Sequence, residues 1–197
     1  MPLMSLRYVL LALLSKEPNT GYGLARLLQG QLSHLWESRL QQIYSELGKL
    51  RAHGLVEAET VILRNRPTKK TYTVMPAGYE ALDDWLRLPP SPVRSKNDLL
   101  VKLYCLERIP KDLLVRRLEE QRDRYESDLR ELSQRLAEVR RAGPAELGHV
   151  LTLEAALAQA EGLASWCAKA LSRLEDAAPH SHSGAEVSVG ESGKPPR

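Results

Sequence analysis

One predicted helix carries short polar side chains opposite its apolar side. Within residues 38–52 the apolar residues recur at helical spacing: Leu40, Ile43, Leu47 and Leu50. The other side presents amides, hydroxyls and one cation: Ser38, Gln41, Gln42, Ser45 and Lys49. Short amide and hydroxyl groups can hydrogen-bond to base edges in a DNA major groove. For this helix taken alone, a solvated face of accidental composition is the alternative.

Basic side chains are concentrated in the turn sequence 64–70. No acidic residue lies between Glu59 and Glu80, and the cations of this turn are Arg64, Arg66, Lys69 and Lys70. Cations at a hairpin tip suit phosphates or the minor groove. A solvated charged turn is the alternative, but the position beside the polar helix face favours contact with double-stranded DNA.

The net charge supports this placement. Residues 1–88 hold 11 Lys and Arg against 8 Asp and Glu, whereas residues 89–176 balance at 15 against 15. The excess positive charge of the chain, +3, therefore lies in the part that carries the polar helix and the basic turn.

The aromatic residues could contact DNA, lie in the core or line a small-molecule pocket. Tyr44 lies on the flank of the polar face, where its hydroxyl could reach a phosphate, although a core position fits nearly as well. We expect Tyr8 and Tyr22 to be core residues. A small-molecule pocket could be lined by the two cysteines together with three aromatics, but aromatics at helical spacing are more often core residues: Trp85, Tyr104 and Trp166.

No catalytic or metal-binding pattern appears in the sequence. There is no glycine-rich phosphate loop, zinc spacing or nucleophile elbow. His180 and His182 near the C-terminus form only a weak metal motif. We therefore predict that the protein is not an enzyme and uses neither a metal nor a cofactor.

Cysteine usage and hydropathy indicate a cytoplasmic protein. Cys105 and Cys167 lie in apolar-periodic stretches, which argues against a disulfide framework and fits a reducing compartment. The longest apolar stretch, residues 8–14, is too short to cross a bilayer and has no following cleavage site. No membrane partner is expected.

The polar helix is the third of three predicted helices, which cover about residues 3–15, 20–30 and 38–52. Asn19 or Thr20 can cap the second helix. Ser38 and Gln41 predict a capping box for the third.

Gly54 predicts a left-handed stop to the third helix, with Leu50 contacting Leu55 in a Schellman motif. Two β segments follow, at 55–63 and 71–75, and a fourth helix starts near Pro76. This order predicts a winged helix-turn-helix domain with a two-stranded β wing over residues 1–88.

The rest of the chain is predicted to be a linker, a helical domain and a tail. Residues 89–96 are the linker, residues 97–176 are helical with a break at Pro110, and residues 177–197 have a disordered composition. Apolar residues of the helical domain recur at steps of three and four, which favours a helical hairpin and a homodimer. The predicted dimerisation residues are Leu114, Leu118, Leu153, Leu157, Leu171 and Leu174. The predicted fold class is mainly α.

The sequence resembles the PadR-like transcriptional regulators over about residues 3–175. The resemblance rests on several short motifs in order: Gly21-Tyr22, Tyr44-x-x-Leu47, Gly54-Leu55 and Tyr72 with Gly78. It implies a homodimeric winged-helix repressor whose third helix and wing contact operator DNA. The two long C-terminal helices look like the branch with phenolic-acid-responsive founders, so the resemblance implies a small-molecule effector, with an aromatic one as the candidate.

One residue departs from the family pattern. Met75 stands where family members usually have a threonine that caps the fourth helix, and the loss costs about 1 kcal/mol. The leading function is a sequence-specific DNA-binding regulator of an inverted-repeat operator. A winged-helix protein-interaction adaptor and a small-molecule carrier are the alternatives, and the basic wing favours the regulator over the adaptor.

Overall fold

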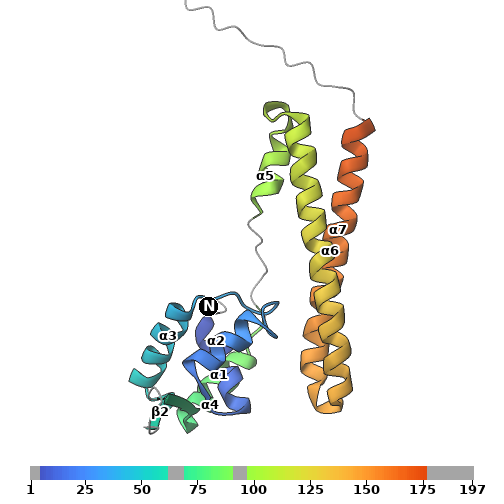
Figure 1. Ribbon diagram of the computed structural model, residues 1–197. Coiled ribbons are helices and arrows are strands. Elements are labelled where there is room, and N and C mark those ends of the chain that lie inside the picture. The colour runs from blue at the N-terminus through green and yellow to red at the C-terminus, as the bar shows by residue number, and fades with distance from the viewer. Residues whose placement is uncertain (1–4, 62–68, 91–96, 177–197) are drawn as a thin grey trace, which may run out of the picture. The chain divides into compact units, whose positions relative to one another are not determined.

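The computed structural model describes residues 5–61, 69–90 and 97–176 (Figure 1). The chain divides into two compact units: residues 1–96 with 130–159, and residues 97–129 with 160–197. The first unit contains the helices α1 (Leu6–Lys16), α2 (Gly21–Gln29), α3 (Leu40–Ala52) and α4 (Pro76–Leu86). Its strands are β1 (Asn19–Thr20), β2 (Val56–Val61) and β3 (Lys69–Val74). The predicted winged helix-turn-helix fold is confirmed.

A small antiparallel sheet has the strand order β1-β3-β2. In β2 and β3, Val56 pairs with Val74, and the short strand β1 pairs Asn19 with Tyr72. The sequence did not predict β1. The same segment caps α2, because the Thr20 hydroxyl accepts a hydrogen bond from the Gly23 amide at 2.9 Å. This confirms Thr20 as the cap.

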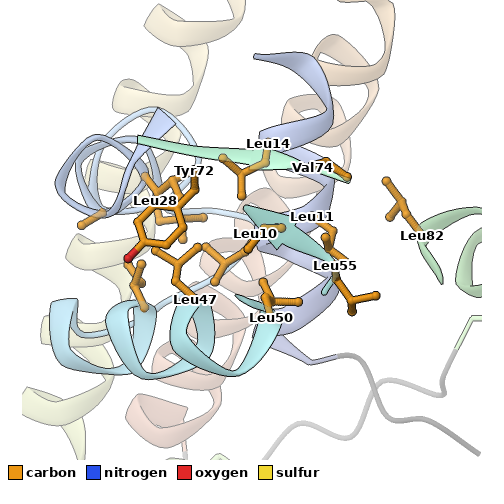
Figure 2. Close-up of a cluster of buried hydrophobic side chains, with 14 residues drawn as sticks. Leu10, Leu11, Leu14, Leu28, Leu47, Leu50, Leu55, Tyr72, Val74 and Leu82 are labelled. Atoms are coloured by element: carbon orange, nitrogen blue, oxygen red, sulfur yellow. The ribbon is translucent and has the colours of Figure 1, made fainter. Parts of the chain in front are cut away.

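The core of the winged domain lies between α1, α2, α3 and the sheet (Figure 2). Ile43, Leu47 and Leu50 of α3 are buried, as predicted. Leu40 is 39% exposed, so its predicted core position is wrong. Leu40 is the first residue of α3.

The two ends of α3 differ in how well the sequence predicted them. The predicted capping box of Ser38 and Gln41 is wrong, because the N-cap is Arg39 and the Arg39 amide donates to Gln42 Oε1 at 2.9 Å. At the other end, Gly54 has φ +69°. The Leu55 amide donates to the Leu50 carbonyl at 3.0 Å and the Gly54 amide donates to the Arg51 carbonyl at 3.0 Å. These bonds confirm the Schellman motif.

Helix α4 starts without a side-chain cap. Met75 is the N-cap residue and its side chain makes no capping bond, as expected from the sequence. Its amide instead donates to the Leu55 carbonyl at 3.0 Å. A Cβ at Gly78 would lie 2.1 Å from that same carbonyl oxygen. Glycine is therefore required where α4 crosses Leu55.

The C-terminal helices are α5 (Asp98–Tyr104), α6 (Lys111–Ala142) and α7 (Leu147–Asp176). Pro110 precedes α6, and Gly143, with φ 107°, makes the turn before α7. The predicted helical content and the predicted break at Pro110 are confirmed.

Two apolar clusters hold α6 against α7. In the first, Leu114 and Leu118 pack with Leu171 and Leu174. In the second, Leu153 packs with Leu132 and Leu136, and Leu157 contacts this cluster. All six predicted dimerisation leucines pack against neighbouring residues of the same chain.

Candidate nucleic-acid interface

Helix α3 presents a continuous exposed face opposite its buried side. This face contains four of the predicted polar residues, together with the flanking tyrosine and two small residues: Gln41, Gln42, Tyr44, Ser45, Gly48, Lys49 and Ala52. Ser38 does not belong to it, because only 9% of Ser38 is exposed and its hydroxyl has no hydrogen-bond partner. The structure therefore places four of the five predicted polar residues on one accessible surface.

Two of these side chains have local partners. Gln42 Oε1 accepts the Arg39 amide, so this oxygen is held at the helix start. Lys49 Nζ lies 3.0 Å from Glu46 Oε2. An exposed ion pair of this kind contributes about 0–1 kcal/mol. Lys49 can therefore exchange Glu46 for a phosphate at little cost.

Tyr44 joins α3 to the start of α2. A Cβ at Gly21 would lie 2.4 Å from Tyr44 Cε1, so the ring packs directly on the backbone of α2 and requires glycine there. Tyr44 is nevertheless half exposed. The packed ring and the exposed part of Tyr44 are both consistent with the predicted position on the flank of α3, between its buried side and its polar face.

Tyr22 was predicted to be a core residue, and this is wrong, because 61% of it is exposed. The apolar residues Leu24 and Leu28 point to the opposite side of α2, so the helical phase would have identified Tyr22 as a surface residue. Tyr8, in contrast, packs against the core and stacks on Trp85 with a centroid distance of 4.9 Å. Tyr22 is thus an accessible aromatic in the first turn of α2, near the residue on which Tyr44 packs.

The basic wing is described only in part. Arg64 and Arg66 lie outside the described residues, while Lys69 and Lys70 begin β3. The Lys70 ammonium lies 5.7 Å from the centroid of the Tyr72 ring. Burial raises the pKa of Tyr72, and the nearby Tyr44 phenol raises it further. The flank of α3 and the start of β3 therefore meet around Tyr72.

Other chemistry finds little support in the described residues. They contain no cluster of three or more His, Cys, Asp or Glu side chains suited to a metal ion. Cys105 and Cys167 are free, and burial raises the pKa of the Cys167 thiol, which makes it a poor nucleophile. Within the same residues, no helix is long and apolar enough to cross a membrane.

The arrangement fits readout of a DNA groove. A rigid helix held by three buried side chains presents neutral hydrogen-bonding groups, and cations flank it on Lys49 and Lys70. Neutral groups suit base edges, and cations suit phosphates. No catalytic group is needed for this task.

Comparisons with known proteins agree with this geometry. Residues 10–84 match the transcriptional regulator PadR-like family, and residues 95–175 match the virulence activator alpha C-terminal family. The negative transcriptional regulator PadR of Bacillus subtilis is 31% identical over 177 residues, which covers 86% of this chain and 97% of that protein.

Solved structures show the same similarity. Bacillus subtilis PadR in complex with operator DNA superimposes with a TM-score of 0.79 at 27% identity, over 88% of this chain and 99% of that one. Bacillus subtilis PadR in complex with p-coumaric acid gives a TM-score of 0.69 at 25% identity, over 86% and 95%. The virulence activator AphA of Vibrio cholerae shares the fold, with a TM-score of 0.70 at 23% identity, over 88% of this chain and 100% of that one. The chain belongs to the PadR-like family of DNA-binding transcriptional regulators.

Proposed function

We propose that this regulator is a cytoplasmic homodimeric repressor that binds an inverted-repeat operator and is released by a small-molecule effector. The observation that carries the DNA-binding part is the exposed face of α3, which presents amide and hydroxyl side chains and one cation while the opposite side is buried. In this proposal Gln41, Gln42 and Ser45 face base edges. Lys49 and the wing cations face phosphates.

Two accessible tyrosines extend this surface. Tyr44 packs on Gly21, which directly precedes Tyr22 in the chain, and both tyrosines are substantially exposed. A phenol hydroxyl can donate to a phosphate oxygen, which positions a protein without reading sequence. We propose that both tyrosines contact the phosphate backbone of the operator DNA.

The dimer needs a surface other than the leucines buried within each chain. Helix α5 offers one, since its exposed apolar side chains are Leu100, Val101 and Tyr104, and Tyr104 is 92% exposed. A second copy would cover them and gain the hydrophobic stabilisation that one chain leaves unused. A two-fold dimer places two copies of α3 on half-sites separated by about one helical turn of DNA or a multiple of it.

The effector part rests on the relatives. Bacillus subtilis PadR is known bound to p-coumaric acid, and its description is that of a negative regulator. We propose an effector of the same chemical class, an aromatic acid, and a function that requires no catalysis by this chain.

Fluorescence anisotropy tests the central claim. The full-length protein is titrated against a labelled fragment from upstream of its own gene and against a scrambled fragment of equal length, at one fixed salt concentration. A specific regulator binds its operator about 10³-fold or more tighter than random DNA. Equal affinity for both fragments at several upstream positions contradicts sequence-specific binding, and absence of any binding supports the protein-interaction adaptor instead.

A further inference from the structure

The loop that leads into α3 is tied to the helical hairpin within the first unit. Arg135 of α6 donates to the Gly30 carbonyl at 2.5 Å and to the Ser33 hydroxyl at 3.1 Å. Both partners lie in the segment 30–39 between α2 and α3. The helix that presents the polar face is therefore linked to α6 through only a few residues.

Two stacked histidines lie at the same contact. The ring centroids of His34, in the loop, and His149, in α7, are 5.8 Å apart and their planes differ by 3°. His34 Nε2 lies 3.1 Å from Thr152 Oγ1, and the Thr152 hydroxyl donates to the His149 carbonyl at 2.8 Å. Because the hydroxyl proton is used there, Thr152 Oγ1 accepts from His34. The neutral His34 ring therefore carries its proton on Nε2.

This tautomer leaves no place for a second proton. His34 Nδ1 is buried without a hydrogen-bond partner, and so is His149 Nε2. A proton added to His34 Nδ1 would be a buried donor with no acceptor, which is costly. The closed contact therefore favours the neutral ring.

Charged groups of both signs surround the histidine pair. Arg135 faces His34 from α6, but its guanidinium is also paired with Glu131 of the same helix. Glu146 Oε2 lies 3.7 Å from His149 Nδ1. Glu138, Glu146 and His149 line one small cavity of about 300 Å³. Burial lowers the pKa of His34, and the positive charges of His149 and Arg135 lower it further.

We propose that His34, stacked on His149, makes the contact between the α2–α3 loop and the hairpin sensitive to pH, so that acidification loosens the loop and weakens operator binding. The predicted effect on operator binding rests on the proposed function. A histidine exposed in an open loop would have the ordinary pKa of about 6.5. In the closed contact its pKa is lower, so the contact is fully favoured above pH 6.5 and weakens as pH falls below it. One linked proton changes the closed-to-open ratio by at most about tenfold per pH unit.

Hydrogen exchange of the loop tests the inference without DNA. The wild-type protein is compared with His34→Gln, because a glutamine amide can still donate to Thr152 but does not titrate. His53→Gln is the matched control, since His53 lies at the end of α3 with its Nδ1 2.7 Å from the Lys49 carbonyl. After correction for intrinsic exchange rates, we expect protection of residues 30–39 to fall several-fold between pH 7.5 and 5.5 in the wild type and in His53→Gln. Protection in His34→Gln should stay constant.

An equal fall in His34→Gln, or constant protection in the wild type, overturns the proposal. If His34→Gln does not fold, nitrogen NMR of the wild-type imidazoles decides instead, because the proposal requires a proton on Nε2 of neutral His34 and a titration midpoint below 6.5. A proton on Nδ1 would contradict it.

Operator affinity is then measured at both pH values. We expect it to fall in the wild type by the same factor as the protection and to remain nearly constant in His34→Gln. If the wild-type protection of residues 30–39 changes with pH while the operator affinities of the wild type and of His34→Gln fall by the same factor, the proposed effect on operator binding is wrong. If no operator is bound at pH 7.5, the proposed function fails, and the exchange data still decide whether the loop contact responds to pH.

Discussion

Gly48 lies in the middle of the exposed face of α3, beside Ser45 and Ala52 along the helix. A glycine in the interior of a helix is destabilising by about 0.8–1.0 kcal/mol relative to alanine. Apart from its chain neighbours and the backbone of its own helix, a Cβ at Gly48 would meet no atom within 4 Å. No steric cost offsets the gain, so Gly48→Ala should raise the free energy of unfolding by about that amount.

For a chain of this size, 1 kcal/mol corresponds to about 2–4 °C in Tm. Gly162→Ala is the matched control, because Gly162 is also an exposed glycine inside a helix with no atom near its Cβ position. It should stabilise the protein by a similar amount. Gly78→Ala should act in the opposite direction, because its Cβ would lie 2.1 Å from the Leu55 carbonyl oxygen. Such overpacking costs about 1–3 kcal/mol, which outweighs the helix-propensity gain.

Operator binding should separate Gly48 from its control. If the centre of this face approaches the base edges, an added methyl group costs about 1–3 kcal/mol of binding free energy. This corresponds to an affinity loss of about 5- to 150-fold. Gly162→Ala should bind operator as the wild type does. Thermal unfolding and anisotropy on the three variants give both quantities.

Two results would refute this reasoning. If the Gly48→Ala variant is stabilised and still binds the operator as tightly as the wild type does, this part of α3 does not approach DNA closely. A Gly48→Ala variant that is not stabilised, while Gly162→Ala is, would contradict the open helical environment of Gly48.

Three further predictions address the remaining surfaces. The double variant Lys69→Ala with Lys70→Ala should weaken binding to all DNA sequences. It should also reduce the slope of log K against log salt by about 1.8, since each phosphate contact contributes about 0.9. An unchanged slope would show that these two lysines of the wing do not contact phosphates. Ser45→Ala should change affinity for the operator more than affinity for random DNA, and equal losses on both would argue against base readout. Tyr104→Glu should shift the protein from dimer to monomer in light scattering, because a carboxylate would be desolvated in the proposed α5 interface; an unaltered dimer places the interface elsewhere.

The sequence predicted best where local backbone chemistry decides the structure. Gly54 and Leu55 define the end of α3 because only a few residues are involved and glycine is needed at positive φ. The start of α3 was misplaced because Ser38, a good cap by type, is buried, and the Gln42 side chain closes the first turn instead. Strand β1 was missed because two residues give no periodicity, and their partner Tyr72 is distant in sequence.

The leucine pattern of α6 and α7 shows a different limit. A repeat of apolar residues at steps of three and four requires a packing partner, but it does not state whether that partner is in the same chain. Leu114 and Leu153 are completely buried within one chain. The exposed side chains of α5 have no comparable repeat, since they follow one another over a single short helix.

Leu55 has a consequence for how new binding specificities can arise. Its amide bonds to the Leu50 carbonyl at the end of α3, its carbonyl accepts the Met75 amide beside the wing, and Gly78 of α4 lies over that carbonyl. One residue therefore sets the angle between helix and wing, and that angle cannot be adjusted without disturbing three elements. Retargeting of such a protein, by evolution or by an engineer, should proceed through exchange of exposed α3 side chains on an unchanged frame.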